Sequence, residues 1–425
     1  MLLEGFYILA KILVLYIQRL YYKDPIVMNE NFAQIDKPTI LVSNHPNTLL
    51  DAIFAAATVS EQVKFLANYS LFKSKFGGWF FNTFYCLPVQ RPEDIEGGKT
   101  NNKTSIAKSH QHLADGGTLY VAAEGYSIHS LGIRPLKTGA ARLALGTEEE
   151  LDWNAEIQIL PVGLNYEEAD RFRSNLVVHV GKPYTVKEWR SEYIQDPRST
   201  VKKVTGQLED QMKSVLLHSD AERTDVFKKI RSYLNASSPT DPKREYLRSR
   251  KLLFDLNSSN VEEVQTYANE IQQFEDNCSI SNYSGVQVAQ AFNHQNKPIQ
   301  LSRLIASLPI TIIGFLTNVI PYLLCHWIEQ KGNKTLEYRS TYRTMSGMIL
   351  FPLMYLFWMW LISFLTNNVI LTLGSVLVYR RSGIYAWHQI KEWSNYFCSN
   401  KIIKHDPQHI DQLKTILSSI DQLSV

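Results

Sequence analysis

Short apolar runs alternate with longer amphipathic stretches between residues 30 and 190. The apolar runs have the length of buried strands and cover residues 39–43, 63–67, 118–123, 157–164 and 175–180. The stretches 49–60, 100–115 and 136–147 have the pattern of helices. Two glycine pairs predict tight turns, Gly116–Gly117 before a strand and Gly77–Gly78 ahead of an aromatic helix. This alternation predicts an α/β domain whose sheet is flanked by helices.

The first segment, residues 2–22, is apolar and aromatic and lacks the small-residue cleavage site of a signal peptide. We expect a helix that lies in the membrane interface or enters it obliquely. A fully spanning helix and a core helix of a soluble domain are the alternatives. The large apolar side chains that recur at helical spacing are Leu2, Phe6, Leu9, Leu13, Ile17 and Leu20.

Long apolar runs return in the last third of the chain. At ~1.5 Å per residue, the run 304–327 can cross a hydrocarbon layer of ~30 Å, although Pro309 and Pro321 would kink such a helix. Residues 348–365 form a second run, and residues 369–379 are too short to span alone. We therefore expect a kinked membrane span followed by a tight helical hairpin. The basic residues that flank these runs do not decide which side of the membrane each end faces.

Between the α/β block and these runs the chain is polar and helical. The segment Ser258–Glu263 is typical of a capped helix start, and no motif in this stretch carries recognisable chemistry. We therefore divide the chain into an N-terminal membrane-associated helix (1–29), an α/β domain (30–190), a helical insertion (191–300), transmembrane segments (301–385) and a polar C-terminal tail (386–425).

Charge and cysteine content narrow the classes of function. Basic and acidic side chains nearly balance, 44 against 41, so no nucleic-acid partner is indicated. His110 and His112 are two positions apart on an expected helix and face different directions, so these and His129 are explained as solvated histidines rather than metal ligands. The four cysteines have neither metal-site nor disulfide-framework spacing; they are Cys86, Cys278, Cys325 and Cys398.

A histidine and an aspartate share the turn after the first expected strand. His45 and Asp51 lie in the segment Asn44–Asp51, just before the helix-like residues 52–57. Histidine can take up and return a proton near physiological pH when its tautomer is fixed, and a carboxylate that accepts a hydrogen bond from one ring nitrogen fixes it. The pair can therefore act as a general base, although an isolated pair of this kind is more often a helix cap beside a surface histidine.

Polar residues also follow the ends of later apolar runs. They stand in the segments Phe84–Arg91, Leu119–Ser127, Arg134–Ala141 and Ile157–Tyr166. In an open α/β sheet, ligands bind beyond the strand ends. In this order and at these spacings, the blocks and the His45 turn resemble the glycerolipid acyltransferase family, which makes lysophosphatidic and phosphatidic acid. The resemblance covers roughly residues 35 to 185 and implies an acyltransferase-like mixed sheet.

One departure from that family lies between the base and the carboxylate. The family pattern has four intervening residues, whereas five separate His45 from Asp51. The branch that acylates glycerol 3-phosphate or dihydroxyacetone phosphate is similar in having His-x-Asn-x-x-x-Asp, and Glu-Gly-x-Ser followed by Pro-Leu-Lys-x-Gly resembles the same branch. Because asparagine tolerates left-handed backbone angles, we expect Asn47 to absorb the extra residue.

The resemblance implies roles for individual residues. His45 is expected to take the proton of the acceptor hydroxyl, while Asp51 holds the imidazole. Arg91 and Glu124 are expected to contact the glycerol phosphate, Glu124 through a glycerol hydroxyl, and Lys137 is an added phosphate candidate. Oxyanion stabilisation is expected from backbone N–H groups near Asn44–Asn47 or around Gly125. The full set of expected substrate-binding residues is Asn44, Arg91, Glu124, Gly125, Ser127 and Lys137.

Three of these residues have alternative explanations. Arg91 could form a surface salt bridge with Glu93 or Asp94, and Glu124 could be a buried structural acceptor. Ser127 could be a covalent nucleophile, but no Gly-x-Ser-x-Gly elbow surrounds it.

The sequence thus predicts a membrane-bound acyltransferase whose active-site domain faces the cytoplasm. Its expected partners are acyl-CoA or an acyl carrier protein (acyl-ACP) as donor, glycerol phosphate or lysophosphatidic acid as acceptor, and membrane lipids. A thioester is already activated, so no metal, cofactor or covalent intermediate is required. The alternatives are an acyltransferase for a different lipid or sugar acceptor and an inactive membrane lipid-binding or scaffolding protein. A scaffold would have no reason to keep the acid/base pair.

Overall fold

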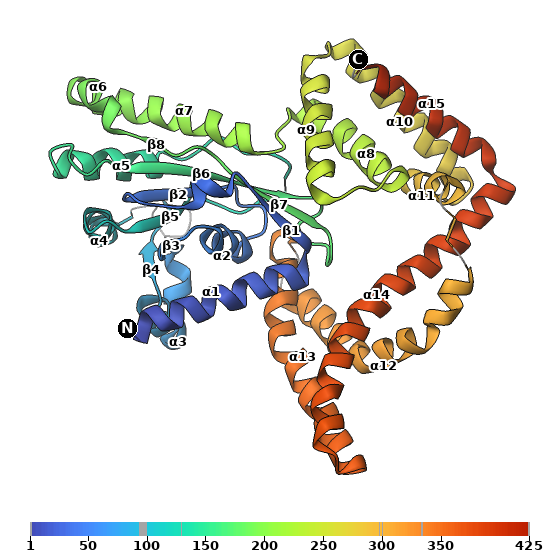
Figure 1. The fold of residues 1–425 in the computed structure, drawn as a ribbon. Helices are drawn as coiled ribbons and strands as arrows, with labels where there is room; N and C mark the ends of the chain where they lie inside the picture. Colours follow the sequence, from blue (N-terminus) through green and yellow to red (C-terminus); the bar gives the residue numbers. More distant parts are fainter. Residues whose placement is uncertain are drawn as a thin grey trace. The chain divides into compact units, whose positions relative to one another are not determined.

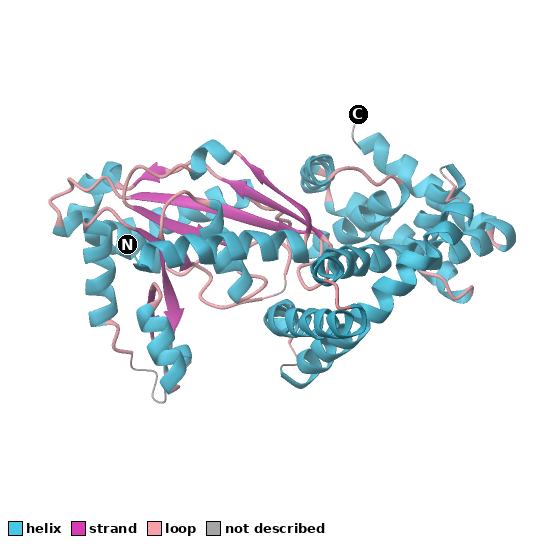
Figure 2. Ribbon diagram, turned by 60° about the horizontal axis from the view of Figure 1, so that its bottom comes forward, coloured by secondary structure: helices cyan, strands magenta, loops and turns pink. Residues whose placement is uncertain are grey.

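The computed structural model describes residues 2–92, 100–128, 130–296, 298–299, 301–332 and 335–423. The chain divides into two compact units. The first contains Met1–His218 together with Thr335–Thr341, and the second contains Ser219–Lys334 together with Tyr342–Val425. The first unit carries the sheet, and the described residues of the second are almost entirely helical (Figures 1 and 2).

One mixed eight-stranded sheet forms the centre of the first unit. Its order is β1-β7-β6-β2-β5-β3-β4, and β8 pairs with β6. Strands β7 and β8 run antiparallel to β6, while the other pairs are parallel, so the predicted mixed sheet is confirmed. The strands are β1 (Lys23–Met28), β2 (Thr39–Ser43), β3 (Val63–Asn68), β4 (Cys86–Val89), β5 (Thr118–Ala122), β6 (Gln158–Tyr166), β7 (Asn175–Val180) and β8 (Tyr184–Thr185).

Helices cover both faces of this sheet. They are α1 (Leu2–Tyr21), α2 (Leu49–Thr58), α3 (Lys75–Thr83), α4 (Lys103–Ala114), α5 (Gly139–Glu150), α6 (Arg190–Gln195) and α7 (Pro197–Val215). Successive side chains of a strand point to opposite faces. Ile40 and Val42 accordingly join the core under α5 and α7, whereas Leu41 joins the core under α2 and the end of α1 (Figure 1). This double cover explains why all five residues of β2 are apolar or small and buried.

The five expected strands correspond to β2, β3, β5, β6 and β7, and the two edge strands β1 and β4 were not among them. Each edge strand contains a proline, Pro25 in β1 and Pro88 in β4. An edge strand tolerates proline because one of its two sides makes no hydrogen bonds to a neighbouring strand. Gly116, at φ +85°, makes the expected turn before β5.

The turn expected at Gly77–Gly78 is wrong, because both residues lie inside helix α3. A Cβ on Gly78 would lie 2.9 Å from the Phe72 carbonyl oxygen. Glycine therefore serves there for close packing of α3 on the preceding 3-10 turn, not for a bend.

The second unit is built from helices. They are α8 (Ala221–Ser237), α9 (Pro242–Ser258), α10 (Val261–Ile280), α11 (Gly285–Asn296), α12 (Leu301–Gly332), the greater part of α13 (Leu336–Thr366), α14 (Val369–His405) and α15 (Pro407–Leu423). The expected capped start is confirmed, because Asn260 and Glu263 form a reciprocal capping box at the start of α10. Residues 386–423 are also helical, since they complete α14 and form α15.

Two helices among the described residues, α12 and α13, are long and apolar enough to cross a membrane. Only 33% of the most apolar stretch of α12, and 0% of that of α13, is buried against protein. Helix α1 is not one of these candidates. Its Ile17 and Tyr21 are buried in the first unit, while Leu9 and Leu13 on its other side are exposed.

The runs 348–365 and 369–379 lie in consecutive helices, α13 and α14, which contact each other through Trp358 and Tyr379, with ring centroids 5.8 Å apart. Helix α14 follows α13 directly but packs its backbone against α12. A Cβ on Gly314 of α12 would lie 2.0 Å from the Ser382 carbonyl oxygen of α14, so a small residue is what permits this approach. Pro309 and Pro321 lie inside α12 without ending it.

Candidate active site

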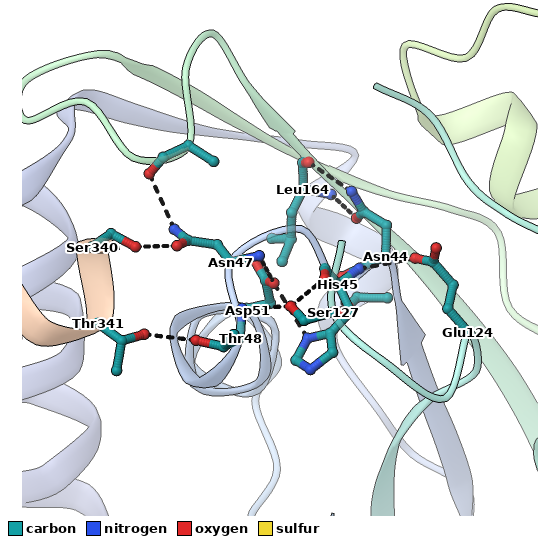
Figure 3. A network of polar contacts seen from close by, with 12 residues as sticks. Asn44, His45, Asn47, Thr48, Asp51, Glu124, Ser127, Leu164, Ser340 and Thr341 are labelled. Atoms are coloured by element: carbon teal, nitrogen blue, oxygen red, sulfur yellow. Dashed lines mark hydrogen bonds and ion pairs between the residues drawn. The ribbon is translucent and has the colours of Figure 1, made fainter. Parts of the chain in front are cut away.

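The His45 turn lies at the carboxyl end of β2, a central strand of the sheet (Figure 3). Strand β5 on one side leads into Glu124, and strand β6 on the other side contains Leu164 and Tyr166. Parallel strands end at the same edge, so the segments that follow β2 and β5 meet there. The His45 turn and Glu124 therefore lie together beyond the strand ends, where the sequence pattern placed them.

His45 and Asp51 face each other across this turn. Nδ1 of His45 lies 3.3 Å from Oδ2 of Asp51, within ion-pair distance but without hydrogen-bond geometry, and catalytic contacts of this kind often tighten only when a substrate binds. Asp51 is fully buried in the first turn of α2. The same Oδ2 accepts a hydrogen bond of 2.5 Å from the Asn47 amide, and Oδ1 accepts one of 2.7 Å from the Tyr166 hydroxyl.

Burial raises the pKa of Asp51, because desolvation disfavours the carboxylate. His45, Tyr166 and the Asn47 amide all oppose this rise because they favour the ionised form. Two donors, the Asn47 amide and the Tyr166 hydroxyl, thus hold the carboxylate in one orientation, as it must be held to orient an imidazole.

The extra residue of the loop is accommodated at Thr48, not at Asn47 as expected. Thr48 has φ 47° and ψ −123°, and Asn47 is not among the residues with positive φ. Positive φ is costly for a β-branched residue, so Thr48 must be held from outside. Its amide donates a hydrogen bond of 2.9 Å to Ser127 Oγ. The Asn47 side chain is engaged elsewhere, donating to the Tyr22 hydroxyl over 2.8 Å.

Asn44 fastens the start of the turn to β6. Its side-chain amide donates to the Leu164 carbonyl oxygen over 3.0 Å, and its Oδ1 accepts from the Leu164 amide over 2.8 Å. With 4% of its surface exposed, Asn44 is buried and holds the start of the loop, and its expected contact with substrate stays a prediction.

Glu124 and Ser127 hold the backbone of His45. Glu124 Oε1 accepts from the His45 amide over 3.0 Å, and Oε2 accepts from the Arg134 amide over 3.3 Å. Ser127 Oγ donates to the His45 carbonyl oxygen over 2.6 Å, and the Ile128 amide donates to the same oxygen. Burial raises the pKa of Glu124. Glu124 is thus a buried acceptor of backbone hydrogen bonds, which is one of the two explanations considered for this residue.

Arg91 contacts Gly125, and the methylene stem of Lys137 lies beside it. The Arg91 guanidinium donates to the Gly125 carbonyl oxygen over 2.8 Å. Gly125 has φ +82°, and Lys137 Cγ lies 3.2 Å from where its Cβ would be, so only glycine fits. Arg134, which the sequence did not single out, is exposed beside Tyr126 and donates to its hydroxyl over 3.2 Å. Glu93 and Asp94, the alternative partners of Arg91, lie outside the described residues.

The backbone amides expected to stabilise an oxyanion are largely occupied. His45 donates to Glu124, Asn47 to Asp51, Thr48 to Ser127, and Gly125 to Ala122. An oxyanion at this site would need other donors.

The helical histidines are not solvated as expected. His110 Nδ1 lies 2.6 Å from Glu150 Oε1 with the His110 side chain 12% exposed, and His112 Nε2 lies 3.0 Å from the Thr118 carbonyl oxygen. His129 lies outside the described residues. Within the ranges described, the structure has no cluster of three or more metal-ligating side chains.

The sequence pattern did not identify Tyr166, nor the residues from a distant part of the sequence that contact Asn47 and Thr48. Tyr166 ends the apolar run of β6, so its position at the strand end was the available signal. Ser340 donates to Asn47 Oδ1, and Thr341 Oγ1 lies 2.8 Å from Thr48 Oγ1 (Figure 3). These two residues precede an apolar run in the sequence, and no local pattern marks them.

Comparisons with known proteins relate the residues around this turn to one family. Residues 25–165 match the family model described as Acyltransferase. Glycerol-3-phosphate O-acyltransferase 2 of Saccharomyces cerevisiae is 30% identical over 118 residues, 28% of this chain and 16% of the yeast protein. Glycerol-3-phosphate O-acyltransferase 1 of the same yeast is 25% identical over 289 residues, 60% of this chain and 36% of the yeast protein. The matches therefore span well under half of either yeast protein.

Among solved structures, the crystal structure of the 1-acyl-sn-glycerophosphate (LPA) acyltransferase PlsC from Thermotoga maritima is similar with a TM-score of 0.34 and 17% identity, covering 50% of this chain and 88% of that one. The family match contains the strand β2, the His45 turn and the Glu124–Lys137 segment. Residues 25–165 of this chain are thus a domain of the Acyltransferase family, distantly related to the yeast glycerol-3-phosphate O-acyltransferases.

Proposed function

We propose that this chain transfers a fatty acyl group from an acyl thioester, acyl-CoA or acyl-ACP, to a hydroxyl of glycerol 3-phosphate or 1-acylglycerol 3-phosphate in phospholipid synthesis. The observation that carries the proposal is the His45–Asp51 pair, 3.3 Å apart at the end of β2 inside the Acyltransferase-family domain. The named activity of the two yeast relatives supports glycerol 3-phosphate as an acceptor.

In this proposal His45 acts as a general base. With Nδ1 directed at Asp51, Nε2 takes the proton of the acceptor hydroxyl while the hydroxyl oxygen attacks the thioester carbonyl carbon. The C–S bond then breaks, the thiolate leaves, and the proton returns from the imidazolium to the sulfur. Asp51 stabilises the imidazolium and remains ionised. A positioned general base typically contributes ~10²- to 10⁴-fold to the rate.

We assign the acceptor phosphate to the cations around Gly125. Guanidinium and ammonium groups bind phosphate best; Arg91 donates to the carbonyl oxygen of this glycine, and the methylene stem of Lys137 lies beside it. Three residues expected to bind substrate are engaged with backbone groups, which favours a positioning role for them: Glu124 and Ser127 bond to His45, and Asn44 bonds to Leu164 of β6.

We further propose that the enzyme works at a membrane, with its active-site domain on the cytoplasmic side. Acyl chains and lysophospholipids partition into bilayers, so a site that uses them must lie near one. The apolar helices α12 and α13 are the candidates for crossing the bilayer, and the exposed apolar side of α1 is the candidate for contact with its surface.

The direct test is an acceptor panel. The full chain, purified in detergent and returned to phosphatidylcholine vesicles, is incubated with radiolabelled palmitoyl-CoA or palmitoyl-ACP and glycerol 3-phosphate, dihydroxyacetone phosphate, 1-acylglycerol 3-phosphate, a lysophosphatidylcholine or a sugar. We expect label in lysophosphatidic or phosphatidic acid. Transfer only to lysophosphatidylcholine or the sugar would overturn the choice of acceptor, and no transfer to any of these acceptors would overturn the proposed acyltransferase activity.

A further inference from the structure

Two of three consecutive polar residues in the first turns of α13, Ser340 and Thr341, contact the loop between His45 and Asp51, and Arg339 lies beside Asp170. Arg339 Nη1 lies 3.5 Å from Asp170 Oδ2, Ser340 donates to Asn47 Oδ1, and Thr341 Oγ1 lies 2.8 Å from Thr48 Oγ1. Residues Thr335–Thr341 are grouped with the sheet-bearing unit, although they follow its other residues by more than a hundred positions. Figure 3 shows Ser340 and Thr341 pointing at the loop that joins His45 to Asp51.

The loop they contact is strained and needs support on two sides. Thr48, with φ 47° and ψ −123°, is held through its amide by Ser127 and through its hydroxyl by Thr341. A backbone conformation of this kind persists only where its surroundings over-determine it. Removing the Thr341 hydroxyl takes away one of these two supports.

Asn47 transmits the contact to the acid/base pair. Its side chain is buried, donating to Tyr22 and Ala169 and accepting from Ser340. Its backbone amide donates to Asp51 Oδ2, the same oxygen that lies 3.3 Å from His45 Nδ1. A shift of Asn47 therefore moves a hydrogen bond made by the oxygen that orients the imidazole.

We propose that Ser340 and Thr341 are positioning residues for the His45 base, so that the start of helix α13 completes an active site whose other residues lie within the Acyltransferase-family domain. The inference rests on the proposed acyl transfer for its kinetic consequence. It also predicts a loop geometry that can be measured without turnover. It assigns a function to a segment that lies outside residues 25–165 and directly precedes a long apolar run.

The kinetic test removes each hydroxyl with little change of shape. We expect Ser340→Ala and Thr341→Val to lower kcat about 10- to 100-fold, the order that a misplacement of ~1 Å at a reacting group causes, with KM for donor and acceptor little changed. Thr341→Ser keeps the hydroxyl and should restore most of kcat.

Thr344→Val is the matched control. Thr344 lies one turn further along α13, is 8% exposed, and its buried hydroxyl has no hydrogen-bond partner among the described residues. The same substitution there should leave kcat unchanged. If Thr344→Val lowers kcat as much as Thr341→Val does, the effect belongs to the helix and the proposal is wrong.

A second readout does not depend on turnover. In the full chain in detergent, we measure amide hydrogen exchange of a peptide spanning residues 44–51 and the pH dependence of His45 carbethoxylation by diethyl pyrocarbonate. Ser340→Ala and Thr341→Val should accelerate exchange in this peptide and change the pH dependence of His45 carbethoxylation. Thr341→Ser and Thr344→Val should match the wild type in both measurements.

The two readouts separate the failure of this inference from failure of the proposed function. Wild-type protein without acyl transfer, but with the expected exchange and carbethoxylation changes, would overturn the function and support the positioning role. Active protein in which Ser340→Ala and Thr341→Val keep normal kcat and exchange would overturn the positioning role alone.

Discussion

The Tyr166 hydroxyl donates a hydrogen bond to the Asp51 carboxylate, with 2.7 Å between Oη and Oδ1. Burial raises the pKa of Tyr166, so this hydroxyl keeps its proton and acts as a donor at neutral pH. Burial also raises the pKa of Asp51, and the bond from Tyr166 opposes that rise. Tyr166 therefore favours the ionised form of Asp51 that the proposed mechanism requires.

Tyr166→Phe should move the acid limb of the pH–rate profile to higher pH. Without the donor, the pKa of Asp51 rises further, so the carboxylate is neutralised and loses its hold on the imidazole at a higher pH. A hydrogen bond to a charged group is worth about 1.5–3 kcal/mol, which corresponds to a shift of about one pH unit or more. Measuring kcat/KM from pH 5 to 9 checks this, with Tyr184→Phe, in the two-residue strand β8, as control. An unchanged acid limb would contradict the role given to Tyr166.

Asp51→Asn should lose activity while its stability, relative to the wild type, rises with pH. The folded protein binds the Asp51 proton more tightly than the unfolded chain, because burial raises the pKa of this group. As the pH rises from about 3.9, the unfolded chain ionises first, so the wild type loses stability until the pH passes the folded pKa. The asparagine variant has no such loss. Thermal unfolding of both proteins between pH 4 and 7 tests the sign of this difference, and the opposite slope would contradict a raised pKa.

The central pair could be read from the sequence because its members share one short segment. His45 and Asp51 stand between a recognisable strand and helix, so local pattern alone placed them on one turn. The groups that hold this turn come from elsewhere: Tyr166 lies 115 residues from Asp51, and Ser340 lies 293 residues from Asn47. Such contacts arise from tertiary packing, which leaves no periodic signal at either end.

Residue type alone gave a wrong prediction for the His45 loop, where more than one residue could adopt the unusual backbone angles. Asn47 is the better left-handed residue by intrinsic preference, yet its side chain has three buried partners and Thr48 takes the unusual backbone angles instead. Glu124 accepts hydrogen bonds from two backbone amides, and its expected contact with a glycerol hydroxyl stays a prediction. The sequence shows which polar side chains are present, whereas tertiary packing decides which of them already have hydrogen-bond partners within the protein.

Arg91→Lys should weaken acceptor binding more than donor binding. A lysine replaces the planar fork by a point charge and cannot keep both the Gly125 contact and a bidentate phosphate contact. Loss of one charge-assisted hydrogen bond, about 1.5–3 kcal/mol, predicts a rise of about tenfold or more in KM for the phosphorylated acceptor. Arg142→Lys, exposed on α5, is the control and should change neither constant. A rise confined to KM for the thioester would show that Arg91 serves the donor.

The full chain should resist extraction by alkaline carbonate through α12 and α13. Their apolar surfaces are mostly uncovered by protein, so a bilayer is the environment that would bury them. A Leu9→Ser, Leu13→Ser double variant should reduce contact of α1 with the membrane surface and leave carbonate resistance intact. Release of the unmodified chain into the carbonate supernatant would show that α12 and α13 are packed within protein.

The most direct measurement of the central claim is the acyl-transfer rate of His45→Ala beside that of His110→Ala. Both histidines are part-buried and lie within ion-pair distance of a carboxylate, but only His45 stands at the end of β2. The account predicts a loss of at least ~10²-fold in kcat for His45→Ala, the minimum for a general base, and near-normal kcat for His110→Ala. More than about a tenth of wild-type activity in correctly folded His45→Ala would contradict the assignment of His45 as the base.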